Sequence, residues 1–553
     1  MDLLDVVATV VNVSSMATRA VLEVFRPLPP RIDNLSDVDN IGFSPAPESR
    51  AWWPVTPATL CVFLVSASLI YCTTFLFYNA YLHPLRSFPG PLAGRSTEWW
   101  KVYIEVFQKE SWAEVLQRLH ERYGDVVRTA PNELHFANPQ AYFDIYAPAI
   151  RWDKEETLYH SMAVDNTSFG YLKYQDAKQR KDVLQPLFSR RAVSSIQGLV
   201  KQKLDDFCDI LTAANFAKQP SNLYLGLRCL TVDTISAFCF GKSVGALAAP
   251  SFNAPIVQAM DFANPEGIPI GRSTIPPDLS GFAQIANLTQ PQVDAVIRDP
   301  STLEKFPNQT IYHRLLDPSN QDGHPIPSRE HILQEAKNLI FAGSDTTGNT
   351  LYVGFWQLIQ NQALQSQLRT ELKSIWPDLA AESPTYEAIS SLPLLSAIIK
   401  ESLRVSSGVV SPLSRVVPQA GATIDGHRIP GGTIVGMSAI FMHYNTDIFP
   451  DPHKFNPRRW ISGDDESPSR FRELERYLVP FSRGPRSCLG INLAYCELSM
   501  TFAWVVRKFE LSLSDEEAQK VDVDEHGNLV WRDTFLPWFY GRRYEAFCRP
   551  VGS

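Results

Sequence analysis

The stretch Pro480-Phe-Ser-Arg-Gly-Pro-Arg-Ser-Cys-Leu-Gly490 decides the fold of this chain of 553 residues. It has the form F-x-x-G-x-R-x-C-x-G, in which Cys488 lies between two glycines and follows an arginine. Glycine lets a backbone approach a flat ligand closely, and neighbouring positive charge lowers the pKa of a thiol. A thiolate that binds haem iron needs both, together with N–H groups directed at the sulfur. The spacing therefore favours an iron ligand over an ordinary turn with a buried cysteine.

The residues that follow this loop, Ile491 to Met500, are typical of a helix. Cys488 would then lie just before a helix N-terminus, where the helix dipole and the free N–H groups favour an anion. Arg486 precedes the cysteine by two positions and is expected to pair with a haem propionate.

The loop resembles the cysteine loop of the cytochrome P450 superfamily of haem-thiolate monooxygenases. Every position of the family pattern is matched, by Phe481, Gly484, Arg486, Cys488 and Gly490. The resemblance implies haem b with the Cys488 thiolate as its axial ligand, which favours cleavage of the O–O bond. It also implies the cytochrome P450 fold, mainly α with a small β-rich region, over residues 95–553.

Composition sets limits on the other classes of function. Hydrophobic residues make up 44% of the chain and charged residues 20%, which is typical of a folded protein. The net charge is −8 and no basic run is present, so nothing favours binding to nucleic acid. The eight cysteines lack the paired spacing of metal ligands, which indicates a reducing compartment around the main domain.

A membrane anchor is predicted near the N-terminus, at residues 55–80. Between Ala51 and Leu85 there is no Asp, Glu, Lys or Arg, and about 20 apolar residues are enough to cross a bilayer as a helix. Arg and Lys are more frequent after this span than before it, which places the C-terminal side in the cytosol. Residues 1–54 would be a lumenal extension, in which Asp2 to Phe25 form either a second helix lying on the membrane or a poorly ordered extension.

A proline-rich hinge at residues 81–94 follows the anchor, because Pro84, Pro89 and Pro91 end any helix and stiffen the chain. The resemblance agrees with this order of segments and implies a single-pass protein of the endoplasmic reticulum membrane with a cytosolic catalytic domain.

A long helix is predicted from an N-cap at Ser328 towards Gln360. Within it, the polar sequence Ala342-Gly-Ser-Asp-Thr-Thr347 interrupts an apolar surface, and Gly343 costs about 1 kcal/mol relative to alanine. A threonine hydroxyl can bond to the carbonyl one turn earlier and bend the helix. We therefore expect a locally broken helix that carries an acid and a hydroxyl, as proton delivery over a haem requires.

This sequence matches the family signature A/G-G-x-D/E-T-T/S of the helix that crosses the distal haem face. The resemblance assigns to Thr346 the hydroxyl that stabilises bound dioxygen and guides its protonation. It assigns to Asp345 the acid that connects this relay with solvent.

A second helix is predicted over Leu392 to Arg404, with Glu401 and Arg404 on one face. On its own, such a pair would be a weak surface ion pair. The family has a buried Glu–Arg pair that is joined by an arginine from an F-x-P-x-R-[FW] segment, here Arg459. The implied role is structural, since removal of one partner leaves a buried charge unpaired.

The haem propionates need basic partners. Arg415, in a region of short strands from Ser414 to Val435, matches the propionate-binding arginine of the family, with a solvated strand-edge cation as the alternative. On the helix before Leu187, the family has an aromatic or histidine residue and a cation four positions later. This chain has Ala177 and Lys181 there, and either Lys181 or the adjacent Arg180 would contact the propionate.

The resemblance implies that electrons come from NADPH through a separate NADPH–cytochrome P450 reductase. In agreement with this, no G-x-G-x-x-G motif for binding a dinucleotide follows a strand in this chain. The reductase is expected to dock on the side of the cysteine loop. The basic residues available there are Arg472, Arg476, Arg483 and Arg486.

The implied reaction inserts one oxygen atom from O2 into a hydrophobic small molecule. The sequence around Phe441 to Pro452 is similar to that of filamentous-fungal members, many of which modify terpenoids or polyketides. Segments Tyr159 to Leu172 and Asn264 to Gln290 are expected to contact the substrate.

Two other classes of function stay open: a haem-thiolate isomerase or dehydratase that needs no external electrons, and a non-catalytic haem-binding protein.

Overall fold

The computed structural model describes residues 57–162, 164–262, 280–306, 308–321, 323, 325–461 and 468–551. The N-terminal extension and much of the Asn264 to Gln290 segment therefore lie outside the described residues. The chain divides into two compact units, of which the second, residues 75–269 and 275–553, carries the site.

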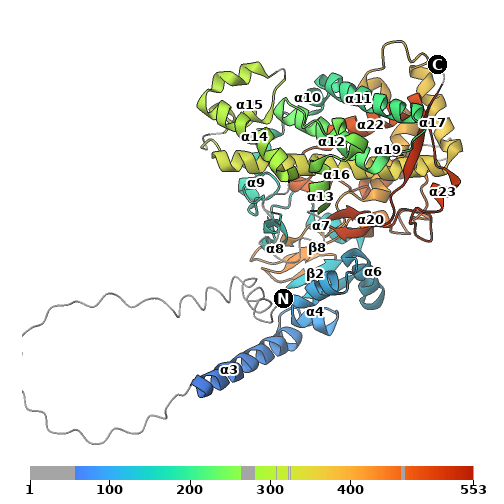
Figure 1. Cartoon of the computed structure of the whole chain (residues 1–553). Coiled ribbons are helices and arrows are strands. Elements are labelled where there is room, and N and C mark those ends of the chain that lie inside the picture. The colour runs from blue at the N-terminus through green and yellow to red at the C-terminus, as the bar shows by residue number, and fades with distance from the viewer. Residues whose placement is uncertain are drawn as a thin grey trace, which may run out of the picture. The chain divides into compact units, whose positions relative to one another are not determined.

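Helices make up most of this second unit, as the resemblance implied (Figure 1). Its α-helices are α4 Leu92–Ser96, α5 Trp99–Val102, α6 Trp112–Tyr123, α7 Pro139–Ile145, α8 Glu156–His160, α9 Tyr174–Leu184, α10 Arg190–Ser195, α11 Gln197–Phe216, α12 Leu223–Phe240, α13 Pro255–Phe262, α14 Ser280–Arg298, α15 Ile311–Leu315, α16 Arg329–Gln360, α17 Gln362–Ile375, α18 Tyr386–Ser390, α19 Pro393–Ser406, α20 Ile440–His443, α21 Pro468–Tyr477, α22 Ile491–Lys508 and α23 Asp515–Ala518.

The strands are short and form small sheets. The largest sheet has the order β1-β2-β8-β5-β3, in which β2 and β8 are parallel and the other neighbours antiparallel. Its strands are β1 Val126–Ala130, β2 Glu133–Phe136, β3 Asp153–Lys154, β5 Arg415–Val416 and β8 Ile434–Gly436. The remaining strands are β4 Ser221–Asn222, β6 Ala422–Ile424, β7 His427–Ile429, β9 Phe509–Ser512, β10 Arg532–Thr534, β11 Leu536–Trp538 and β12 Glu545–Pro550.

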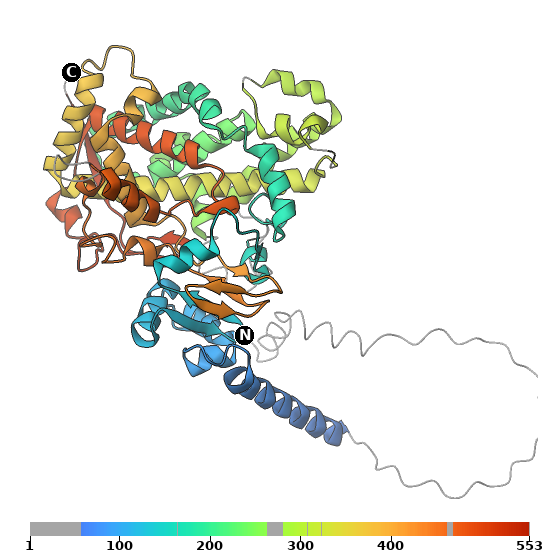
Figure 2. The same ribbon diagram turned by 180° about the vertical axis from the view of Figure 1, so that it is seen from behind.

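The long helix α16 crosses this unit, and α12 lies along it in both views (Figures 1 and 2). The Ser328 side chain caps α16 by accepting from the N–H of His331, as predicted. At Gly343 the two helices approach so closely that a Cβ atom would lie 2.7 Å from the Ile235 side chain. The expected break in α16 is absent: the helix is continuous through Ala342–Thr347, although the Thr346 hydroxyl does donate to the Ala342 carbonyl at 2.8 Å.

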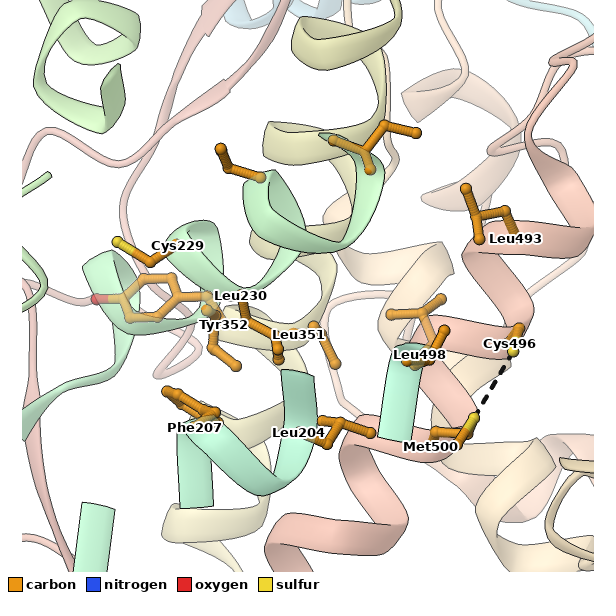
Figure 3. Packing of buried hydrophobic residues seen from close by; sticks show 14 of the residues in the cluster. Leu204, Phe207, Cys229, Leu230, Leu351, Tyr352, Leu493, Cys496, Leu498 and Met500 are labelled. Atoms are coloured by element: carbon orange, nitrogen blue, oxygen red, sulfur yellow. Dashed lines mark hydrogen bonds between the residues drawn. The ribbon is translucent and has the colours of Figure 1, made fainter. Parts of the chain in front are cut away.

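Four helices, α11, α12, α16 and α22, meet in the hydrophobic core (Figure 3). Leu204 and Phe207 come from α11, and the other labelled residues come from α12, α16 and α22. These helices fix α16 and α22 relative to each other. Because Cys488 lies just before α22 and Asp345 lies on α16, this packing sets the frame of the site.

The helix α3, Pro57–Phe77, has no buried residue and a π-helical turn, Tyr78–Leu82, follows it. Pro57–Leu82 and α12 are the helices among the described residues that are long and apolar enough to cross a membrane. Their mean hydropathies are 2.2 and 1.4, and 94% of α12 is buried, so α12 is a core helix.

Candidate active site

The cysteine loop is held in shape by its own backbone. The N–H of Cys488 donates to the Phe481 carbonyl at 2.9 Å, and a short 3-10 turn covers Gly484–Arg486. Gly484 has φ +71°, and a Cβ atom there would lie 2.6 Å from the Tyr146 carbonyl oxygen. The glycine is needed both for its backbone conformation and for this close approach. The Phe481 ring packs against Tyr495, with centroids 5.6 Å apart.

Cys488 is exposed to solvent, but protein atoms surround much of its thiol. Burial is the largest effect on its pKa and raises it, whereas the Gly490 N–H and the positive charge of Lys181 lower it. Gly490 is the N-cap residue of α22, so the sulfur lies at this helix N-terminus, as predicted. Binding to a metal ion deprotonates such a thiol and overrides the effect of burial.

Three of the residues proposed to bind propionates lie in this loop or near it. Lys181, on α9, donates to the carbonyls of Ser487 at 2.7 Å and Pro485 at 3.2 Å. Arg486 donates to the carbonyls of Tyr171 and Leu172, and its Nε is buried without a partner among the described residues. Burial and the charge of Arg415 lower the pKa of Arg486 to about 10.

Arg415, on β5, is 4% exposed and donates to the Tyr159 hydroxyl at 3.0 Å. It is therefore a buried cation and not the solvated strand-edge residue that was the alternative. None of Lys181, Arg415 and Arg486 has a described carboxylate within 4.0 Å. A cation in the protein interior is costly unless an anion accompanies it.

Arg180 lies elsewhere. Its guanidinium pairs with the buried carboxylate of Glu335 on α16 at 3.2 Å. Glu335 also accepts from the N–H and hydroxyl of Ser168, at 2.8 and 2.7 Å. Of the two residues considered for the propionate, Lys181 is thus the one beside the cysteine loop.

On α16, the acid and the hydroxyl differ in their surroundings. Thr346 is partly exposed and lies one turn from Ala342, which is exposed despite its place in the middle of the helix. Asp345 is buried and accepts from Nε of Arg228 at 2.7 Å. The α16 surface at Ala342 and Thr346 is therefore open, whereas Asp345 is directed towards α12.

Arg228 is shared between two carboxylates. Its Nη1 donates to Asp261 on α13, and Asp261 also accepts from Arg543 at 3.1 Å. Asp261 therefore has a second cation, and its pKa is lowered overall even though burial opposes this. Burial raises the pKa of Asp345, and the nearby Asp261 adds to that effect while Arg228 opposes it. Asp345 is consequently the carboxylate that takes up a proton more readily.

The ion pairs around Glu401 form a second buried network. Arg404 donates to both carboxylate oxygens of Glu401, at 2.8 and 3.0 Å, and Arg459 donates at 3.2 Å. The N–H of Asn456 and Nε1 of Trp460 supply further bonds, at 2.9 and 2.7 Å. These donors overcome burial and lower the pKa of Glu401.

The arginines expected to attract a reductase divide into two groups. Arg472 and Arg476 are exposed on α21, and Arg476 and Arg483 both lie over the ring of Phe143, at 4.3 and 5.3 Å. Arg486 instead turns inward to the main-chain carbonyls described above.

The residues present fit a haem. The donor set combines a cysteine at a helix N-terminus with the buried Arg415 and the half-buried Lys181 and Arg486, which lack a described carboxylate. One nitrogen of Arg486 is buried without a described partner. A thiolate ligand for iron and positive charge for propionates are what the group requires.

A family comparison agrees with this geometry. A sequence model of the family described as Cytochrome P450 matches residues 95–534. The chain belongs to this family and is a haem-thiolate monooxygenase.

Similar proteins are fungal. The chain is 30% identical to cytochrome P450 monooxygenase flvC of Aspergillus flavus, over 89% of this chain and 96% of that protein. It is 32% identical to cytochrome P450 monooxygenase macH of Penicillium terrestre, over 88% and 98%. It is 28% identical to N-acetyltryptophan 6-hydroxylase ivoC of Emericella nidulans, over 83% and 92%.

Sequence reasoning missed the network behind Asp345. Arg228 is a cation in the middle of the apolar sequence Leu223–Phe240, and such a cation needs a buried partner. That signal was available, but its partner Asp261 and the outer residue Arg543 are far apart in sequence and carry no motif.

Proposed function

We propose that this enzyme hydroxylates or epoxidises a hydrophobic small molecule in a fungal biosynthetic pathway, with a terpenoid or polyketide skeleton as the substrate class. One oxygen atom of O2 enters the product, and the other leaves as water with two electrons from NADPH and two protons. The support is the family membership and the relatives, of which one is named for the hydroxylation of an aromatic amino-acid derivative.

In this proposal Cys488 is the axial ligand, with Phe481, Gly484 and Gly490 shaping the loop. Lys181, Arg415 and Arg486 hold the propionates, and haem bound there supplies the activation of O2. Glu401, Arg404 and Arg459 keep the segment before the cysteine loop in place.

The observation that carries the reaction class is the contrast between Thr346 and Asp345. Thr346 Oγ1 lies on the open surface of α16, where it can hold and pass a proton. Asp345 is buried next to it in sequence, and its pKa is raised, so it can be protonated more easily than an ordinary aspartate. Through Arg228 it is connected to Asp261, whose side chain is 23% exposed.

We propose NADPH–cytochrome P450 reductase as the electron donor, docking near Arg472, Arg476 and Arg483. The anchor is α3, which would hold the enzyme in the endoplasmic reticulum membrane with the catalytic domain in the cytosol. Asn79 and Ala80 are buried, and the Asn79 carbonyl accepts from Arg128 at 2.8 Å. Removal of residues 1–77 should therefore release a soluble protein that keeps its haem, whereas a cut after residue 80 should destabilise it.

The deciding experiment is the difference spectrum of the reduced, carbon-monoxide-bound protein, for the wild type and Cys488→Ala. The wild type should show the red-shifted band of a thiolate ligand, and the variant should lose it. Turnover with reductase, NADPH and labelled O2 should then place one labelled oxygen atom in each product molecule. Turnover without NADPH would instead indicate an isomerase or dehydratase.

A further inference from the structure

Arg128, on β1, is a buried cation outside the set of residues assigned to the haem. Its side chain is 0% exposed, and it donates to the Pro131 carbonyl at 3.0 Å through Nε and to the Asn79 carbonyl at 2.8 Å through Nη2. Its Nη1 is buried without a partner among the described residues. In the described part of the chain, no carboxylate lies within 4.0 Å of this guanidinium. A buried positive charge that meets only neutral carbonyls is costly, so the position calls for an anion.

A second arginine, Arg95 on α4, lies near the first. The helix α4 packs on β1, and Asn79 connects the two arginines: its carbonyl accepts from Arg128, and its side-chain amide donates to the carbonyl of Ser96 at 3.1 Å. Arg95 is half-buried, and its Nε is also buried without a described partner. Burial and the charge of Arg95 lower the pKa of Arg128 to about 10, as expected for two cations with no anion between them.

Exposed apolar side chains accompany this pair of arginines. The Tyr78–Leu82 turn contacts α4, and Leu82, Leu92 and Trp99 are each half-exposed. The turn is the last part of the apolar stretch Pro57–Leu82, which contains the proposed anchor. Basic groups that follow a membrane span directly are typical of recognition of anionic lipid headgroups. A phospholipid offers both a phosphate for the arginines and acyl chains for the apolar side chains.

We propose that Arg95 and Arg128 bind the phosphate group of an anionic phospholipid, with its acyl chains against Leu82 and Leu92. A guanidinium presents a planar fork of N–H donors that matches phosphate oxygens, and each arginine has one nitrogen without a described partner. The lipid strengthens the attachment of the hinge to β1, where the N–H of Arg128 donates to the Pro89 carbonyl at 2.7 Å. The inference rests on the proposed anchor, which brings the site to a membrane, and does not depend on the haem assignment.

The test compares Arg95→Gln, Arg95→Lys and the control Arg86→Gln in the full-length haem protein, kept in a neutral detergent and a phosphate-free buffer. Arg86 is an exposed arginine of the same hinge, so its variant removes one positive charge outside the site. We measure the rise in unfolding temperature on addition of dihexanoylphosphatidylglycerol, because a ligand that binds only the folded state stabilises it. Arg95→Gln should need about tenfold more lipid for the same rise, as expected for loss of a hydrogen bond between charged groups. Arg95→Lys should need an intermediate amount, and Arg86→Gln should match the wild type.

Absence of a rise in the wild type, or the same dependence on lipid in Arg95→Gln, would overturn the proposal. An equal loss in Arg86→Gln would overturn it as well, since it would indicate a diffuse attraction between charges. An equal rise with the same concentration of inorganic phosphate would show that free phosphate, and not a lipid, is the ligand.

If Arg95→Gln does not fold, as judged by circular dichroism, Arg95→Lys decides the matter. It keeps the charge but loses the fork of donors, so an unchanged dependence on lipid in this variant would overturn the proposal. Sedimentation of the wild type with vesicles of phosphatidylcholine alone tests the anchor separately. The carbon monoxide spectrum of the same samples tests the haem assignment.

Discussion

Two buried networks of carboxylates and arginines lie in this protein, and the pKa values of their central carboxylates are shifted in opposite directions. Glu401 accepts from two arginines, a main-chain N–H and an indole, so its pKa is lowered and it stays ionised. Asp345 accepts from one described arginine, Arg228, which it shares with Asp261, and its pKa is raised.

The number of donors for each carboxylate accounts for this difference. A buried carboxylate with several well-placed donors is a fixed structural anion, because loss of any one partner is costly. A buried carboxylate with one shared donor can gain or lose a proton at a smaller cost, as an acid in a relay must. Both networks are buried ion pairs, but only the one at Asp345 reaches a partly exposed pair, Asp261 and Arg543.

The largest effect is expected from Arg404→Met. Arg404 donates to both oxygens of Glu401 and to the carbonyls of His443 and Pro452. Its loss leaves a buried carboxylate under-compensated, which costs about 3–5 kcal/mol. Denaturant unfolding measures this loss, with the exposed Arg458→Met as the matched control. A loss no larger than that of the control would show that the Glu401 network is not structural.

The second prediction concerns Asp345→Asn, which should fold and keep the thiolate-type spectrum. Asparagine keeps the size of the side chain but cannot donate or accept a proton at this position. Product formation with reductase should fall about a hundredfold, the range of general acid–base catalysis. NADPH consumption should fall less, because reduction of O2 without product formation can continue. Unchanged product formation would remove Asp345 from the relay.

How far the sequence predicts these networks depends on where their members lie. The pair Glu401 and Arg404 is local, and the loop around Cys488 and the helix start at Ser328 follow from short-range patterns. Trp460 as a donor to Glu401 was not foreseen, although the segment that contains it was. The need of Arg228 for a buried partner could be read from the sequence, but its contacts with Asp261 and Arg543 could not, because distant elements create them and no local pattern specifies them.

A smaller effect is expected from Trp460→Phe, which removes the indole donor and keeps an aromatic ring. Trp460 is buried, and its Nε1 lies 2.7 Å from Oε2 of Glu401. That oxygen keeps its bond from Arg404, so the loss should be about 2 kcal/mol, typical of a hydrogen bond to a charged group. Thermal or denaturant unfolding against the half-exposed Trp99→Phe tests this. Equal stability of both variants would mean that the arginines alone hold Glu401.

The smallest effect concerns how stability depends on pH, because Asp345 and Glu401 should change the free energy of unfolding in opposite directions. Because the pKa of Asp345 is raised in the folded protein, its ionisation opposes folding. The stability of the wild type relative to Asp345→Asn should therefore fall as pH rises through the ordinary aspartate range, and level off above the raised pKa. Each unit of pKa difference corresponds to about 1.4 kcal/mol.

Glu401 has a lowered pKa and contributes in the opposite sense: its stabilisation is present above the ordinary glutamate pKa and is lost as pH falls through the folded value. Unfolding of the wild type and Asp345→Asn between about pH 4 and pH 7 measures the difference. A wild-type advantage that grows with pH would mean that Arg228 outweighs burial, and that Asp345 is a fixed anion like Glu401.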